Sequence, residues 1–284
     1  MWQIGDVKIY SVLELEDAGS VIQDAIKQAS PEVAKKMEWL QPYFIDDNGK
    51  LLSVTQSFLI DNGDEVTLVD ACVGDGKKFD DLPEWSNLST KYLENLDICG
   101  YKPEDIDKVV FTHLHFDHVG WSTVRKDGKL HPTFPNAEYI CNKTEYEYWL
   151  NKPSQELKDD LDAFNTAILP LSGLVRTVSP KEEVAKGVSL TPTYGHTPGH
   201  VCILVQSGDN SALITGDTFH HPCQITHPEW LSFDTDEKAA LDTKKNLIDK
   251  YSDTETLIIG SHFAQPSAGY IKKHEDSYIF EAKE

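Results

Sequence analysis

The sequence predicts an α+β fold in which β-sheets pack together and helices cover them. Strand-like segments come first, helical segments follow, and short strands return in the second half of the chain. This order is typical of a sheet sandwich with helices on its outer faces. With 39% hydrophobic residues and no flexible linker among its 284 residues, the chain has material for a sizeable core. We therefore expect one domain over residues 1–284.

The first strands are indicated by alternation and by turn residues. Val7–Leu15 alternates between apolar and polar side chains, as a half-buried strand does. Ser53–Ile60 and Glu65–Val69 are separated by an Asp-Asn-Gly-Asp sequence. Because an Asn-Gly pair favours a tight hairpin turn, these two segments are predicted to pair. The chain therefore opens with antiparallel sheet.

Two helices and a buried strand are expected before the middle of the chain. A helix over Pro31–Leu40 begins with Ser30 as N-cap and with proline at the first helical position. It interrupts two strands, so we interpret it as a lid or a packing element. Thr90–Cys99 has the spacing of an amphipathic helix that Gly100 ends. The apolar segment Lys108–Phe111 is then a strand that leads directly into a cluster of histidines.

The segment at about 121–171 is rich in charged and aromatic residues, and we interpret it as an insertion on the substrate side of the site. Helices are predicted within it at Lys143–Leu150 and Gln155–Ala167. After this segment the sequence returns to short strands and one more helix. The strands are expected at Val188–Leu190, Val201–Gln206, Ala212–Thr215 and Thr256–Ile259, and the helix runs from Asp236 to Tyr251.

The chain is strongly acidic, with 26 Lys and Arg residues against 47 Asp and Glu residues and a formal net charge of -21 at pH 7. Such a charge repels phosphate backbones and anionic membrane surfaces. We therefore expect neither nucleic acid nor a membrane as a partner.

The cysteines and the N-terminus predict a cytoplasmic protein. The five cysteines are odd in number and form no Cys-x-x-Cys pair, so they indicate neither a disulfide framework nor a thiolate zinc site. The N-terminus lacks a basic segment followed by an apolar one, and no apolar run approaches the ~18 residues that span a bilayer.

The sequence Thr-His-Leu-His-Phe-Asp-His contains the strongest functional signal. It places His113, His115, Asp117 and His118 within six residues, directly after a predicted strand. A turn at this point directs several of these side chains to one spot, and packing alone does not explain such a cluster. Imidazole and carboxylate ligands without thiolate suit zinc, and also iron, manganese or cobalt. The cluster therefore predicts a metal site.

These residues resemble the signature of the metallo-β-lactamase superfamily, His-x-His-x-Asp-His. The later motifs of that family are sought in chain order, and all are present: Gly195–His200, Gly216-Asp217 and Gly260–Phe263. The resemblance extends from the strand that ends at Asp70 to His262. It implies the family fold, a four-layer αββα sandwich with the metals at one edge of the sheets.

The resemblance also implies two divalent metal ions, zinc before iron, manganese or cobalt. The first metal is held by His113, His115 and His196, the second by Asp117, His118 and His262, and Asp217 bridges them. Two dications a few ångströms apart repel each other, so a bridging carboxylate and a hydroxide are needed to hold the pair. The hydroxide is then the nucleophile. Asp117 orients it and carries its proton to the leaving group, so Asp117 and Asp217 are the expected catalytic residues.

Further residues are expected to support the ligands or to bind the substrate. By the same resemblance, Asp70 supports the ligand loop without touching metal, and His200 is a hydrogen-bonding structural residue. His220 lies where some lactone-cleaving relatives have a tyrosine donor. Together with Trp121 and Phe134, it is predicted to face the substrate.

The presence of Asp217 favours one branch of the superfamily. Drug-degrading zinc β-lactamases lack this carboxylate, whereas lactonases, glyoxalase-II-like thioesterases and organophosphate hydrolases keep it. We therefore expect a hydrolase of lactones or aryl esters, with side activity on phosphotriesters. A thioesterase of the glyoxalase II type and a mononuclear iron sulfur dioxygenase remain as enzyme alternatives, and a metal-dependent sensor without turnover is a remote one. The resemblance is also compatible with a homodimer.

Overall fold

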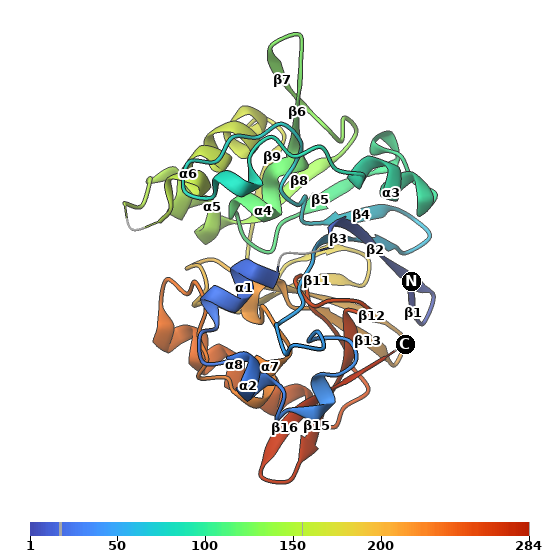
Figure 1. Cartoon of the computed structure of the whole chain (residues 1–284). Coiled ribbons are helices and arrows are strands. Elements are labelled where there is room, and N and C mark those ends of the chain that lie inside the picture. Colours follow the sequence, from blue (N-terminus) through green and yellow to red (C-terminus); the bar gives the residue numbers. More distant parts are fainter. Residues whose placement is uncertain (17–18, 155, 284) are drawn as a thin grey trace.

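The strands of the first half of the chain form one seven-stranded sheet in the computed structural model, which describes residues 1–16, 19–154 and 156–283 (Figure 1). Strands β1 to β4 are antiparallel neighbours, and β4, β5, β8 and β9 run parallel. In sheet order the strands are β1 (Trp2–Ile4), β2 (Val7–Leu15), β3 (Thr55–Asp61), β4 (Val66–Val69), β5 (Lys108–Val110), β8 (Glu138–Asn142) and β9 (Val175–Val178).

The second half of the chain builds a second seven-stranded sheet, in which the neighbours are antiparallel except for the parallel pair β13 and β14. Its strands, in order, are β10 (Glu183–Ala185), β11 (Val188–Pro192), β12 (Val201–Ser207), β13 (Asn210–Ile214), β14 (Leu257–Ile259), β15 (Ala268–His274) and β16 (Ser277–Ala282). A separate hairpin of β6 (Thr123–Lys126) and β7 (Lys129–Pro132) projects from the body.

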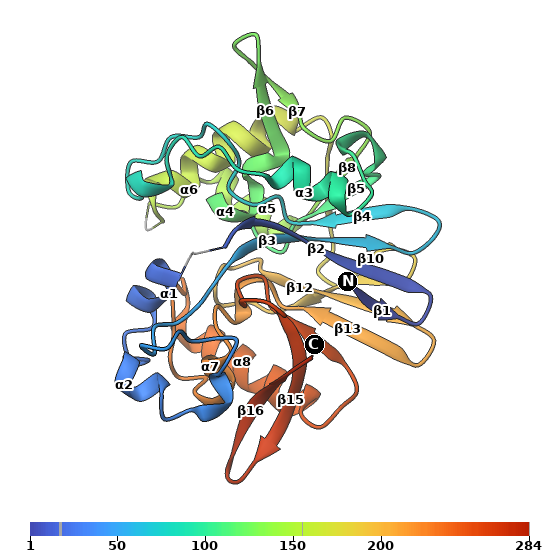
Figure 2. The same ribbon diagram turned by 45° about the vertical axis from the view of Figure 1, so that its right-hand side comes forward.

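Helices cover the outer face of each sheet (Figure 2). On the first sheet lie α3 (Tyr92–Ile98), α4 (Phe116–Val119), α5 (Lys143–Leu150) and α6 (Lys158–Ala163). On the second lie α1 (Gly19–Ala25), α2 (Pro31–Ala34), α7 (Cys223–Thr226) and α8 (Glu237–Tyr251). Short 3-10 helices are Glu38–Leu40, Pro83–Trp85, Pro103–Asp105, Gly120–Ser122, Leu169–Leu171 and Gly216–Thr218, and Phe164–Ile168 is a π-helix, η5.

The buried apolar side chains form three layers, which confirms the αββα architecture. One layer lies between the two sheets, where Phe58 and Val110 of the first sheet pack with Ile203 and Ile259 of the second. The other two layers lie between each sheet and its helices. Because β3 is covered on both faces, all but its last residue are buried, as expected for a strand in the interior of such a sandwich.

Two parallel strand pairs bring the site residues to one edge. In the first sheet Val69 is opposite Val110, so the chain leaves β4 at Asp70 and β5 just before Thr112 on the same side. In the second sheet Ile214 is opposite Ile259, and the chain again leaves both strands on one side. The motifs that follow β5, β13 and β14 therefore meet although they are far apart in the sequence.

The predicted helix over Pro31–Leu40 is wrong in its extent. The α-helix ends at Ala34, and a 3-10 turn follows at Glu38–Leu40. The buried side chains Ala34, Met37 and Leu40 recur every three residues, a spacing that suits 3-10 turns better than an α-helix. Ser30 is not a side-chain cap, because its hydroxyl donates to the Glu32 carboxylate (2.9 Å).

The segment at 121–171 is divided between the sheet and its cover. Strand β8 lies inside the first sheet between β5 and β9, whereas the β6–β7 hairpin and the helices lie outside it. Helix α5 has the predicted bounds. The second predicted helix begins at Gln155, which lies outside the described residues; within them, α6 begins at Lys158 and continues as the π-helix η5. No helix among the described residues is long and apolar enough to cross a bilayer.

Candidate metal centre

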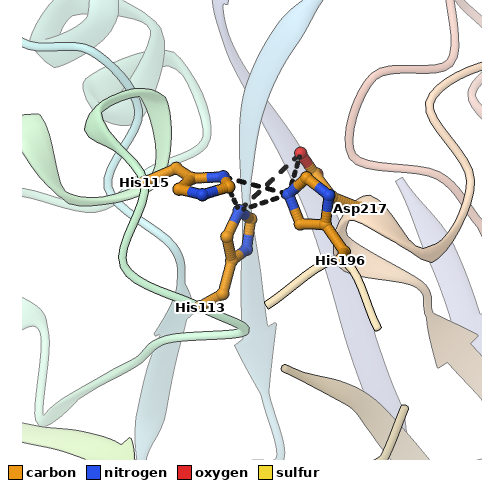
Figure 3. A group of neighbouring side chains, drawn as sticks. All are labelled: His113, His115, His196 and Asp217. Carbon is orange, nitrogen blue, oxygen red and sulfur yellow. Dashed lines mark hydrogen bonds and ion pairs between the residues drawn. The ribbon is translucent and has the colours of Figure 1, made fainter. Parts of the chain in front are cut away.

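The first ligand group combines side chains from both sheets. His113 and His115 lie in the loop after β5, His196 follows β11, and Asp217 follows β13. Their side chains converge from two sides in Figure 3. His115 Nδ1 is 3.0 Å from both His113 Nε2 and His196 Nε2, and those two atoms are 3.2 Å apart. Asp217 Oδ2 is 3.7 Å from His113 Nε2 and 3.5 Å from His196 Nε2.

The second group lies on the other oxygen of Asp217. His118 Nε2 and His262 Nε2 are 3.1 and 3.2 Å from Asp217 Oδ1 and 3.3 Å from each other. Asp117 completes the group, with Oδ1 3.8 Å from His118 Nε2 and Oδ2 3.5 Å from His262 Nε2. Each oxygen of Asp217 therefore faces one group, as a bridging carboxylate requires.

These distances fit two metal ions. Ligand atoms at 2.0–2.2 Å from a tetrahedral zinc ion are separated by about 3.4 Å, close to the separations found in both groups. The three nitrogens of the first group face one another at a spacing that leaves their lone pairs directed at a common centre. Asp217 Oδ1 is buried without a hydrogen-bond partner among the described residues. A buried carboxylate oxygen without a hydrogen-bond partner suits a metal ligand.

Hydrogen bonds to the remote ring nitrogens hold the ligands in place. Nδ1 of His118 donates to Asp70 Oδ2 (2.8 Å), and Nδ1 of His262 donates to the carbonyl oxygen of Val54 (2.9 Å). Each bond fixes the tautomer in which Nε2 carries a lone pair toward the centre. His113 Nδ1 has a similar contact to the Thr112 hydroxyl (3.0 Å). These contacts orient the rings before metal binds.

In the metal-free protein the two groups hold protons differently. Burial lowers the pKa of His113, and burial lowers the pKa of His196 to about 3. Burial also opposes charge on His118 and His262, but the nearby carboxylates, Asp217 before Asp117, together outweigh it and raise the pKa of both rings. In turn these two rings, despite burial, hold the pKa of Asp217 well below its usual value. The carboxylate is therefore ionised and available to bridge two cations.

Asp70 and His200 occupy the supporting positions that the sequence predicted. Asp70 accepts hydrogen bonds from the Thr112 backbone N–H and hydroxyl (both 2.8 Å) as well as from His118. His200 Nε2 accepts the backbone N–H of Asp217 (3.0 Å). Neither side chain belongs to a ligand group. At Gly216 the φ angle is +51°, and a Cβ there would lie 2.6 Å from His200 Nε2, so this turn requires glycine.

Glu145 is a supporting residue that the sequence reasoning missed. This fully buried carboxylate accepts hydrogen bonds from the Leu114 N–H (3.1 Å), the Thr197 hydroxyl (2.7 Å) and the Gly199 N–H (3.0 Å). It therefore joins the His113–His115 loop to the His196 loop. Its helix carries no motif, and its role arises from contacts between segments far apart in sequence.

A cavity of about 430 Å³, the metal-site cavity, opens above both ligand groups. His220 lines it, with Nε2 3.1 Å from Asp217 Oδ2 and Nδ1 2.9 Å from the Ser232 hydroxyl. Burial raises the pKa of Asp160, another lining residue, to about 6. Apart from Asp217, His115, His196 and His262, the remaining lining residues are Val21, Ile22, Leu82, Trp85, Phe116, Asp117, Glu156, Leu157, Phe233, Asp234 and Thr235.

The predictions that Trp121 and Phe134 face the substrate are wrong. Neither is among the described residues that line the metal-site cavity. Trp121 stacks on Tyr92 and donates its indole N–H to Glu14 (2.6 Å), and Phe134 is fully buried in the core of the first sheet. Trp121 follows the ligand loop in sequence, but the 3-10 turn at Gly120–Ser122 directs its side chain into the core.

The fold and the site together define the class of protein. A model of the metallo-beta-lactamase superfamily matches residues 52–262, so the chain belongs to this superfamily. The chain is 31% identical to the N-acyl homoserine lactonase AiiA of Bacillus thuringiensis subsp. kurstaki over 119 residues, which are 42% of this chain and 40% of that protein. It is 28% identical to the probable metallo-hydrolase Rv2300c of Mycobacterium tuberculosis over 144 residues, 48% of this chain and 43% of that protein. The alignments thus span less than half the length of these curated relatives.

Two solved structures share the fold over the whole chain. AidC, a dizinc quorum-quenching lactonase in complex with a product, has a TM-score of 0.79 at 18% identity, over 100% of this chain and 96% of that chain. The hydrolase AbOPH of the beta lactamase superfamily has a TM-score of 0.81 at 25% identity, over the same shares of the two chains. These likenesses confirm the αββα metallo-beta-lactamase fold.

Proposed function

We propose that this chain is a dinuclear metal-dependent hydrolase that cleaves a lactone or an aryl ester. The observation that carries the proposal is the position of Asp217, whose two oxygens each face one complete ligand group at the floor of the metal-site cavity. The similarity to N-acyl homoserine lactonases and to a dizinc lactonase supports the same chemistry.

The ligand residues have separable tasks. When bound, divalent metal ions polarise a substrate carbonyl and lower the pKa of water to about 7. Asp217 holds the two groups together. Asp117, with 14% of its side chain exposed, lines the cavity and can accept and return a proton near the reacting carbonyl. His220 lies at the cavity floor, where the Ser232 hydroxyl orients its ring beside Asp217.

The metal-site cavity combines carboxylates near the metal ligands with an apolar wall. Asp117, Glu156, Asp160 and Asp234 line it, and no lysine or arginine does so among the described residues. Away from the ligand residues its wall is largely apolar and includes the ring of Trp85. The apolar wall therefore suits a lactone or an ester with an apolar part, and a phosphotriester meets the same condition.

The proposal is tested by metal analysis combined with a substrate panel of lactones, aryl esters, thioesters and phosphotriesters. We expect two divalent ions per chain, turnover of a lactone or aryl ester, loss of turnover on chelation, and recovery when zinc is returned. Ester hydrolysis that persists after complete metal removal would contradict the proposal. One iron per chain would favour the sulfur dioxygenase, and saturable binding without turnover across the panel would favour the sensor.

A further inference from the structure

A second cavity, of about 480 Å³, adjoins the metal-site cavity, and Phe116 lines both. Its walls come from the segment after β4, from β6 and β7, and from α6 with the π-helix η5. The β6–β7 hairpin that borders it is the one that projects from the body in Figure 1. None of the ligand residues of the metal centre lines this second cavity.

The carboxylates of the second cavity are already bound by groups of the protein. Asp159, which is buried, accepts the backbone N–H groups of Asp80, Asp81 and Leu82 at 2.7–3.0 Å. The Lys158 ammonium lies between the carboxylates of Asp80 and Asp162. The fourth carboxylate, Asp75, accepts from the backbone N–H and the hydroxyl of Thr90.

Two cations of the same cavity, Lys77 and Arg125, contact neutral oxygens and no carboxylate among the described residues. Lys77 is partly buried, and its ammonium has only long contacts, 3.3 Å, to the carbonyl and hydroxyl oxygens of Thr123. Arg125 donates to the carbonyl oxygen of Gly128 (2.9 Å). Among the residues that the structure describes, neither cation forms an ion pair with a carboxylate. Burial, and next the charge of Arg125, lower the pKa of Lys77 to about 8, although the Glu14 carboxylate raises it.

Lys77 is partly buried without an ion pair among the described residues, whereas Arg125 is exposed. Holding like charges together costs free energy, which an anion between them would offset. Beside the cations the wall is apolar, since the rings of Phe79 and Phe116 pack at 5.0 Å and Ala163 and Ala167 continue the surface. The π-helix that supplies Ala167 is a rare element that often marks functional sites.

We propose that the second cavity binds a small organic anion, with its negative head between Lys77 and Arg125 and its apolar part against Phe79 and Phe116. The ligand class is a short-chain carboxylate or a similar amphiphilic anion. A purely inorganic anion would leave the apolar wall without a partner. This site is separate from the proposed hydrolytic site and does not depend on its activity.

The test is calorimetric titration of the full-length, metal-loaded protein with three probes: hexanoate, inorganic phosphate and hexanol. We expect hexanoate to bind saturably and more tightly than either of the other two. Lys77→Met and Arg125→Met should each raise the Kd for hexanoate at least fivefold. Lys78→Met is the matched control, because Lys78 lines the same cavity but pairs with Asp80 (3.7 Å), and it should change the Kd less than twofold.

Each alternative result overturns the proposal in a different way. An unchanged Kd in both Lys77→Met and Arg125→Met means that hexanoate binds elsewhere, for example at the metals. If phosphate or hexanol binds as tightly as hexanoate, the assigned ligand chemistry is wrong. A titration without saturable heat removes the site altogether. Melting curves of the three variants establish that a changed Kd does not reflect unfolding.

Discussion

The metal-site cavity and the second cavity share one aromatic ring and differ in the charge of their walls. Phe116 packs against Trp85 on the side of the metals (5.4 Å between centroids) and against Phe79 on the other side (5.0 Å). Around the metal centre the charged side chains are carboxylates and histidines, whereas the second cavity contains unpaired Lys77 and Arg125. Similar apolar surfaces are thus combined with different charged groups, so we expect the two cavities to select different ligands.

The largest effect is expected for Asp217→Asn, which should impair the metal-site cavity and leave the second cavity unchanged. Asp217→Asn removes the shared anion between the ligand groups, so we expect metal content to fall and hydrolysis to drop by more than the 10- to 100-fold typical of a supporting residue. Hexanoate binding in the second cavity should be unchanged. Metal analysis, steady-state kinetics and calorimetry measure the three quantities. Asp209→Asn, at an exposed position outside both cavities, is the control.

The second-largest effect is expected at Asp70, whose hydrogen bond orients the ligand His118. Asp70→Asn weakens the hydrogen bond that orients His118 (2.8 Å), and we expect a loss of metal affinity of about 10- to 100-fold. Competition with a chelator of known affinity measures it. Added zinc should restore activity to this variant but not to Asp217→Asn. Equal zinc affinity in Asp70→Asn and wild type would mean that the ring is held by packing alone.

A smaller effect is expected at the apolar wall of the metal-site cavity. Leu157 lines this cavity, and its replacement by alanine removes apolar contact worth about 1 kcal/mol. If substrate chains lie there, KM for a long-chain lactone should rise about fivefold, with little change for a short-chain one and in kcat. Leu174→Ala is the control, because Leu174 is similarly exposed (46% against 45%) and lies outside the cavity. An equal change in KM for both chain lengths would exclude this role.

The smallest effect is a pH-dependent change in stability at Lys77. Its pKa is about 8 in the folded protein and 10.5 as the ordinary value, so the charged form destabilises the fold below pH 8. This cost disappears as pH rises from 8 to 10.5, because the unfolded chain binds the extra proton there. Lys77→Met should therefore raise the free energy of unfolding by about 1 kcal/mol at pH 7, after allowance for solvent screening, and by less at pH 10. Urea denaturation of Lys77→Met and Lys78→Met at both pH values measures the difference; a gain of equal size at both pH values would rule out the charge as its cause.

The sequence predicted the parts of the site that lie in contiguous motifs. His113 to His118 lie in one loop, and the motifs around His196, Asp217 and His262 follow in the order of a known family, so the ligand groups could be assembled without coordinates. The structure brings each of these side chains to the centre.

The walls and supports were not predictable in the same way. Adjacency to the ligand loop suggested Trp121, but a local turn decides its direction, and it bonds to Glu14. Glu145 joins segments far away in the sequence, and Leu157 and Phe233 line the cavity, but no spacing rule indicates these three residues. The C-terminal hairpin of β15 and β16 was also missed, because its exposed side chains give no clear alternation.

The way in which the ligands are divided between the sheets has a mechanical consequence. The first group takes His113 and His115 from the first sheet and His196 from the second, and the other group takes Asp117 and His118 from the first sheet and His262 from the second. An ion bound by each group would thus cross-link the two halves of the sandwich. A ligand present at 100 times its Kd adds about 2.7 kcal/mol to the free energy of unfolding. The metals that would perform the chemistry would therefore also stabilise the packing of one sheet on the other. Chelation would lower the free energy of unfolding and weaken this packing at the edge that holds the site.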